Sequence, residues 1–384
     1  MANLKLSRRD LLKGMGAGAA VAGAGSMVPM TAQAADELKI FVWSGYSSDP
    51  VTSRFADEYD TPVTYELLTS DPDAVNRLRA GEKDIWHIIN LNNPWAREWM
   101  YPEGTIVPLN TERFAPYYEG NKVFPEFHHP YKWAMDLDYE HMLGIVQRIG
   151  TFTYVVNTDK ISQATAESEG WDLFGGLKDR MAILTWDNWN ISHMNLGAGL
   201  NPYEEKSEND MAAFETTCRQ WFNNSAILSD DYFLLNNAML NGEIDAYVTG
   251  SSYTTSTPRL EGYNQFWGTV PDSGPVDGKG GIMWIEITSV VNNANDPTPR
   301  AEDFLEFCLS PELSAVIGQD EDGMTNVAQM SDPECLAHWT TENLHAVQAD
   351  ALEREIERSF DMYINPNYDA QFEIYTAAKR EKES

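Results

Sequence analysis

Short apolar runs alternate with amphipathic segments along most of this chain, and this alternation restricts the fold more than any other feature. Strand-like runs at residues 38–43, 62–68 and 84–89 are separated by helical patterns at 51–59 and 72–80. Strands that alternate with helices in this way form parallel sheets with helices packed on their faces. The sequence therefore predicts an α/β fold.

The same rhythm returns in the second half of the chain. We expect strands at 153–157, 180–185, 246–248 and 283–291, helices at 207–222, 234–241 and 301–309, and a mainly helical segment from 332 to 378. Ligands of such sheets bind beyond the carboxyl ends of the strands. Residues 44–46 and 90–93 follow two predicted strands and are placed at such ends.

Composition limits the class of partner. The chain has 384 residues, 42% of them hydrophobic, and is long enough for two domains with packed cores. Its 27 Lys and Arg residues face 59 Asp and Glu residues, a formal net charge of −32. Such a field repels nucleic acid and anionic lipid, so no nucleic-acid partner is expected. Adaptation to a saline habitat explains the bulk charge better than a specific ligand does.

The three cysteines, Cys218, Cys308 and Cys335, match no zinc-ligand spacing. One disulfide with one free thiol is an open alternative, but we expect free, mostly buried thiols because the chain is predicted to fold in the reducing cytosol.

That prediction comes from the N-terminus, where Arg8 and Arg9 precede a weakly apolar Gly/Ala stretch at 14–28. A small-x-small pattern at 32–34 follows, and this order is typical of a twin-arginine export signal with its cleavage site. The sequence therefore predicts that residues 1–34 are a signal peptide and that the mature chain is exported, already folded, to the periplasm. The apolar stretch is too short to remain as a membrane anchor.

Five segments resemble, in order, the periplasmic spermidine/putrescine-binding proteins of ABC transporters: 40–46, 148–160, 184–187, 241–246 and 280–286. The resemblance implies a type II periplasmic binding protein, in which two crossover strands join two lobes around a ligand cleft. It implies a non-enzymatic monomer without a cofactor, which takes part in polyamine transport by delivering a small amine to an ABC permease in the inner membrane.

The resemblance also implies domain boundaries. Lobe 1 is expected to hold residues 36–149 and 281–320. Lobe 2 is expected to hold residues 150–280 and 321–384, with the C-terminal helices packed across it.

A polyamine requires carboxylates for its ammonium groups and aromatic faces for its methylene chain. The resemblance assigns such contacts to the first turn, to the acidic turn after residue 185, to alternate residues of a late strand and to scattered polar positions. The residues are Trp43, Ser44 and Tyr46; Trp186, Asp187 and Trp189; Trp284 and Glu286; and Asn90, Asn92, Arg148 and Asp361.

Alternative roles stay open for several of these residues. Trp43 could belong to the core, and Asp187 could cap a helix. Arg148 either clamps a ligand carboxylate, which would make the ligand a zwitterion such as a betaine or an amino acid derivative, or pairs with an acid of the fold. Asn190 stands where the family usually has a second acid, which leaves one charge contact unassigned.

Two other functions compete. An exported enzyme is one, but the chain contains no P-loop, GxGxxG, GxSxG or HExxH motif. The histidines His128, His129 and His141 lie in an acidic stretch, yet their spacing fits no standard metal site. The other alternative is ferric-ion binding through the adjacent Tyr117 and Tyr118, which would leave the Trp-rich turns unexplained.

Overall fold

The computed structural model describes residues 37–295, 300–320 and 323–384, all of which belong to the unit Asp36–Ser384. The predicted signal peptide, residues 1–34, lies outside the described residues. Within the described part of the chain, no helix has both the length and the apolar character needed to cross a membrane.

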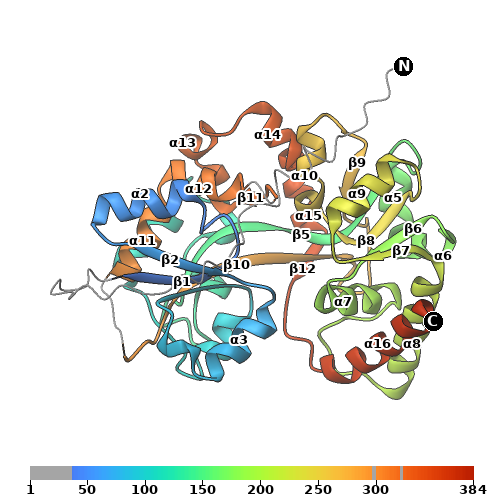
Figure 1. Cartoon of the computed structure of the whole chain (residues 1–384), viewed down its shortest axis with the longest axis horizontal. Helices are drawn as coiled ribbons and strands as arrows, with labels where there is room; N and C mark the ends of the chain where they lie inside the picture. The colour runs from blue at the N-terminus through green and yellow to red at the C-terminus, as the bar shows by residue number, and fades with distance from the viewer. Residues whose placement is uncertain (1–36, 296–299, 321–322) are drawn as a thin grey trace, which may run out of the picture. The chain divides into compact units, whose positions relative to one another are not determined.

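The strands join side by side in the order β2-β1-β3-β10-β5-β8-β6-β7, and Figure 1 shows the long strands β5 and β10 running through the middle. Strands β4 and β12 pair with β10, and β9 and β11 pair with β5. The bounds are β1 Leu38–Val42, β2 Val63–Leu67, β3 Ile88–Asn92, β4 Ile106–Val107, β5 Ile145–Asn157, β6 Met181–Leu184, β7 Ser225–Ser229, β8 Ala246–Gly250, β9 Phe266–Thr269, β10 Gly281–Val291, β11 Asn326–Val327 and β12 Ser359–Asp361.

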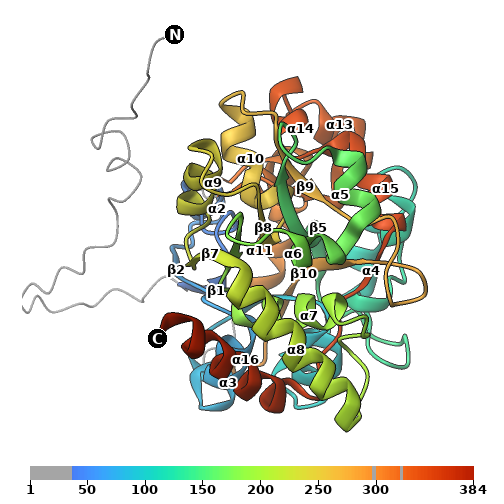
Figure 2. The same ribbon diagram turned by 90° about the vertical axis from the view of Figure 1, so that its right-hand side faces the viewer.

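The helices pack around these strands. They are α2 Asp49–Tyr59, α3 Asp71–Arg79, α4 Thr111–Phe114, α5 Gln163–Glu169, α6 Leu173–Gly176, α7 Asp187–Gly197, α8 Glu208–Asn224, α9 Tyr232–Leu240, α10 Ser252–Leu260, α11 Arg300–Cys308, α12 Pro311–Gly318, α13 Pro333–Leu336, α14 Thr341–Ala346, α15 Leu352–Glu357 and α16 Tyr368–Glu383. Figures 1 and 2 show α16 lying beside α8.

The sheet is parallel on both flanks and antiparallel in the middle. Strand β1 pairs in parallel with β2 and β3, and β6 pairs in parallel with β7 and β8. Strand β10 is antiparallel to both β3 and β5. The predicted α/β fold is confirmed, and its two parallel flanks are joined by two long antiparallel strands.

Two elements differ from the prediction. The third strand begins at Ile88, not at residue 84, because Glu82–Asp84 form a short 3₁₀ turn. Asn90 and Asn92 therefore lie inside β3, and only Asn93 and later residues lie beyond its end. In the C-terminal segment, β12 interrupts the expected helices.

The hydrophobic core is divided into two clusters, and the long strands β5 and β10 contribute residues to both. Ile149 of β5 packs in one hydrophobic cluster with residues of β1 and β3, whereas Phe152 packs in a second cluster with residues of β6 and α7. Strand β10 likewise contributes Ile285 to the first cluster and Trp284 to the second. We call these the first and second clusters below. The three cysteines are buried and free, as expected.

Candidate functional site

A cavity of about 550 Å³ lies where residues of the two clusters face each other. Turns after β1 and β6, the first turns of α3 and α7, the crossover strands and helices α10 and α16 supply its walls. The lining residues are Trp43, Ser44, Thr69, Ser70, Asp71, Pro72, Asn92, Arg148, Phe152, Thr185, Trp186, Asp187, Asn188, Trp189, Tyr253, Trp284, Glu286, Tyr368 and Phe372. We call this space the cleft cavity.

A buried ion pair forms part of the cavity wall. Glu286 Oε1 lies 3.5 Å from Arg148 Nη1, and both side chains are at most 5% exposed. Arg148 Nη1 also donates a hydrogen bond to the carbonyl of Ser44, 3.0 Å away. Burial raises the pKa of Glu286 to about 7, although Arg148 and the Tyr46 hydroxyl favour the ionised form and lower it. The pair therefore provides a carboxylate whose charge is partly, not fully, neutralised.

A second buried carboxylate belongs to Asp71, the first residue of α3. Its oxygens accept hydrogen bonds from the backbone N–H of Asn92 at 3.0 Å and from the Asn92 amide at 2.9 Å. Burial nevertheless raises the pKa of Asp71 to about 6. This residue was not predicted from the sequence. The signal available was an acidic residue at the start of a helix that follows a parallel strand, at the edge of the sheet where ligands bind.

The third carboxylate, Asp187, is the more accessible one, because its side chain is 36% exposed. It lies in the first turn of α7, where the N-cap position is taken by Trp186, so the N-cap alternative is wrong. Its nearest basic group is Lys379 of α16, with Nζ 3.9 Å from Oδ1. Among the residues that line the cavity, three carboxylates thus face one guanidinium, so an organic cation is electrostatically favoured.

Aromatic rings form much of the remaining wall. Trp189 stacks on Phe152 with ring centroids 4.7 Å apart, and the Trp186 indole donates to the carbonyl of Asp230 at 3.1 Å. Trp284 packs against the backbone of Gly150, where an added Cβ would lie 2.9 Å from its ring. These contacts fix the rings before any ligand arrives.

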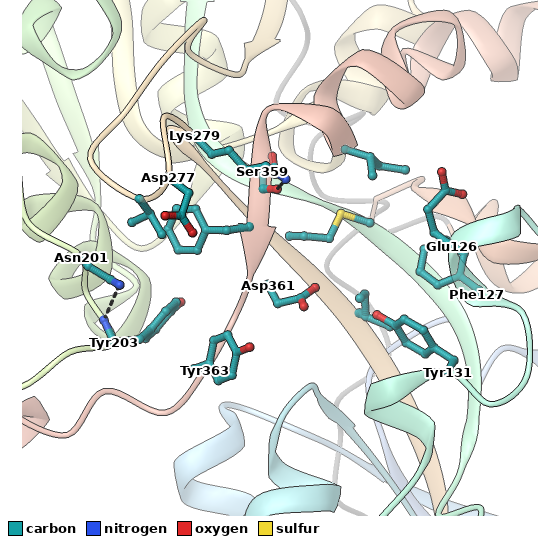
Figure 3. Close-up of a pocket in the computed structure, with 15 residues that line it drawn as sticks. Glu126, Phe127, Tyr131, Asn201, Tyr203, Asp277, Lys279, Ser359, Asp361 and Tyr363 are labelled. Carbon is teal, nitrogen blue, oxygen red and sulfur yellow. Dashed lines mark hydrogen bonds between the residues drawn. The ribbon is translucent and has the colours of Figure 1, made fainter. Parts of the chain in front are cut away.

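Three of the predicted residues do not line this cavity. Tyr46 is fully buried behind it, and its charged neighbours are Glu286 and Arg148. Asn90 is fully buried too and donates from its amide to Thr288 Oγ1 at 2.7 Å. Asp361 lines a different cavity, drawn in Figure 3. Asp361 belongs to β12, a strand that was not predicted from the sequence, because residues 332–378 were expected to be mainly helical.

The other nine predicted residues do line the cleft cavity: Trp43, Ser44, Asn92, Arg148, Trp186, Asp187, Trp189, Trp284 and Glu286. Four further aromatic residues that line the cavity were not predicted: Phe152, Tyr253, Tyr368 and Phe372. Tyr368 and Phe372 are four residues apart on α16 and stack with centroids 5.8 Å apart. Only the helical spacing of this pair was visible in the sequence.

The residues considered for other functions are engaged elsewhere. Tyr118 donates to the carbonyl of Val146 at 2.9 Å, and Tyr117 donates to Glu306 at 2.9 Å. His128 contacts the carbonyl of Gly120 at 2.8 Å. No group of three or more metal-ligating His, Cys, Asp or Glu residues occurs among the residues described.

Two parallel flanks, two crossover strands and a cavity between two hydrophobic clusters define a two-lobed periplasmic binding protein. The chain belongs to the bacterial extracellular solute-binding proteins, whose family model matches residues 51–326. It is thus an extracellular solute-binding protein. The predicted family is confirmed.

Solved structures of this class superpose on most of the chain at low identity. A spermidine/putrescine ABC transporter substrate-binding protein from Streptococcus pneumoniae, PotD, is 16% identical, with a TM-score of 0.62 over 91% of this chain and 100% of its own. A putative spermidine/putrescine ABC transporter from Listeria monocytogenes is also 16% identical, with a TM-score of 0.65 over 91% and 99%.

A third structure carries a different ligand. MotA from A. tumefaciens, solved in complex with glucopine, is 13% identical, with a TM-score of 0.60 over 89% of this chain and 99% of its own. At these identities the likeness shows the fold alone. No curated protein matches the chain.

Proposed function

We propose that the protein binds a polyamine, of the putrescine or spermidine type, in the cleft cavity between its two lobes and delivers it to an ABC permease. The observation that carries this proposal is the combination of Glu286, Asp71 and Asp187 with tryptophan faces around one cavity. Carboxylates at separate points of the wall suit a ligand with more than one ammonium group, and the rings suit its methylene chain.

The lobes proposed are residues 36–149 with 281–320 and residues 150–280 with 321–384. The division of the core along β5 and β10 supports this arrangement, although Leu352 packs in the first cluster and Tyr375 in the second. Export by the twin-arginine pathway through residues 1–34 and a monomeric state are part of the same proposal.

A zwitterionic ligand is the second candidate. It is favoured by buried donors on the cavity wall that lack a hydrogen-bond partner within the described residues, namely Arg148 Nε and the indole N–H groups of Trp43 and Trp284. A ligand carboxylate would satisfy such donors, whereas a pure polyamine offers no acceptor.

Isothermal titration calorimetry separates the two candidates. The purified protein is titrated with putrescine, spermidine, glycine betaine and γ-aminobutyrate. Heat with the first two alone supports the polyamine, and heat with the last two alone supports the zwitterion. No heat with any of the four would remove both candidates.

A further inference from the structure

A second cavity, of about 750 Å³, lies on the other side of strand β10 from the cleft cavity. Side chains alternate along a strand, so neighbouring residues face opposite ways. Trp284 and Glu286 line the cleft cavity, whereas Met283 and Ile285 line the second one. We call this second space the rear cavity. The crossover strand therefore separates two cavities that share no lining residue.

Aromatic residues of both clusters bound the rear cavity. Tyr131 packs against the first cluster, and Tyr203 and Phe360 pack against the second. Tyr203 is held by its own turn, in which its backbone N–H donates to Asn201 Oδ1 at 3.0 Å, and its ring packs edge-on against Phe360 with centroids 6.0 Å apart. The rings of Tyr203 and Phe360 are thus fixed in place by contacts of their own.

A carboxylate lies between these rings. Figure 3 shows Asp361 near the centre of the rear cavity, with Tyr203 and Tyr363 on one side and Tyr131 on the other. Asp361 ends β12, and its backbone is in register with Met283 of β10, so the position of its carboxylate is set by the sheet. Its negative charge contributes to raising the pKa of Tyr131, after burial itself.

The basic groups nearby are committed to other partners. Lys279 Nζ donates to the carbonyl of Ser359 at 2.9 Å. Lys132 Nζ lies over the rings of Trp133 and Tyr363, 4.3 Å and 4.4 Å from their centroids, and contacts the Tyr363 hydroxyl. No ion pair joins Asp361 to a basic side chain within residues 37–295, 300–320 and 323–384.

We propose that the rear cavity is a second binding site, which takes a small methylated ammonium ion between Tyr131 and Tyr203 with Asp361 as its counter-charge. A quaternary ammonium is favoured by aromatic faces and needs no hydrogen-bond acceptors, whereas a primary ammonium has three donors to satisfy. The volume is in the range of small-molecule sites. The site uses no residue of the cleft cavity and so goes beyond the proposed function.

Binding is measured by equilibrium dialysis of the purified protein against labelled tetramethylammonium. We expect Asp361→Asn to weaken binding at this site about tenfold, as loss of one partly buried charge contact would. Tyr131→Leu, which removes a ring face, should weaken it at least about threefold. The matched control Asp277→Asn, at an exposed position on the rim of the same cavity, should change it less than about twofold.

Two further measurements fix the location. Glu286→Gln, which changes no residue that lines the rear cavity, should leave this binding unchanged. Crystals soaked in tetramethylarsonium should show an anomalous peak between Tyr131, Tyr203 and Asp361. Thermal unfolding of each variant without the ion checks that the variant folds. Equal binding by wild type and Asp361→Asn, or an arsenic peak confined to the cleft cavity, would overturn the proposal without touching the proposed function.

Discussion

Replacing Glu286 by Gln tests the cleft cavity most directly, because it removes one charge and almost no volume. A charge-assisted hydrogen bond to a ligand ammonium contributes about 1.5–3 kcal/mol. Arg148, 3.5 Å away, already neutralises part of the carboxylate, so we take the lower value. Affinity for putrescine should therefore fall about tenfold.

The same substitution leaves Arg148 buried without its ion-pair partner. Breaking a buried pair from one side costs about 3–5 kcal/mol. We expect the lower end, about 3 kcal/mol of unfolding free energy at pH 7, because Arg148 keeps its hydrogen bond to the Ser44 carbonyl and because Glu286, with a pKa of about 7, is only partly ionised. Chemical denaturation of both proteins measures this difference.

Glu355 offers a matched control. It is also buried, its pKa is likewise raised by burial to about 7, and it does not line the cleft cavity. Its carboxylate accepts hydrogen bonds from Thr151 at 3.2 Å and from Gln348 at 3.3 Å. Glu355→Gln should cost about 1–2 kcal/mol of stability and leave putrescine affinity unchanged.

Calorimetric titration of wild type and both variants with putrescine at pH 8 decides the matter. The reasoning is refuted if Glu286→Gln binds putrescine as tightly as the wild type, or if Glu355→Gln loses as much affinity. If the protein binds a zwitterion, titration of Glu286→Gln with that zwitterion should give a third pattern. Its ammonium would lose a contact while Arg148 became available to its carboxylate, so the loss should be much smaller than tenfold.

Three further predictions concern the walls and the pH response. Gly150→Ala should push the Trp284 ring aside, lower the free energy of unfolding by about 1–3 kcal/mol and weaken putrescine affinity. In the control variant Gly176→Ala the added Cβ meets no atom within 4 Å, so parallel melts and titrations should show neither change. Lys379→Gln should raise putrescine affinity about twofold at low salt by releasing Asp187, and the gain should vanish in 1 M salt if charge is the cause. Protonation of the two buried cavity carboxylates, with pKa values of about 7 and about 6, should weaken putrescine binding about tenfold between pH 8 and pH 5.5. Because these pKa values are raised, the native state binds more protons than the unfolded state does. Their contribution to stability is therefore full below the unfolded pKa values and is lost as pH rises through 6 and 7. This effect on stability is opposite in sign to the effect on putrescine binding. A binding constant for putrescine that is independent of pH would contradict the binding prediction.

Local patterns predicted most elements because each strand and helix carries its own periodicity. Strand β1 was expected at 38–43 and spans Leu38–Val42, and α8 was expected at 207–222 and spans Glu208–Asn224. The third strand was misplaced by four residues because Ile85 and Trp86 extend its apolar run, although they follow a 3₁₀ turn. Register and turns of this kind depend on neighbouring strands.

The candidate site was partly within reach of the sequence. The family resemblance assigned Trp43 and Asp187 to the site, and the rule that ligands bind at the carboxyl edge of a parallel sheet placed residues 44–46 there, of which Ser44 lines the cleft cavity. Tyr253 could not be placed in this way, because it reaches the cleft cavity from helix α10, whose packing no local pattern encodes. The resemblance assigned Asp361 to the ligand site, but its side chain lines the rear cavity instead.

By itself, the sequence determined the α/β class, the alternation of elements, the acidic charge and the types of side chain available to a cation. These are local or additive properties of the chain. Tertiary structure alone decided that Glu286 meets Arg148, from strands 138 positions apart in the chain, and that Met283 and Trp284 of one strand face two different cavities. The physical reason is that ion pairing, burial and the pKa values they set arise only when distant segments pack against one another.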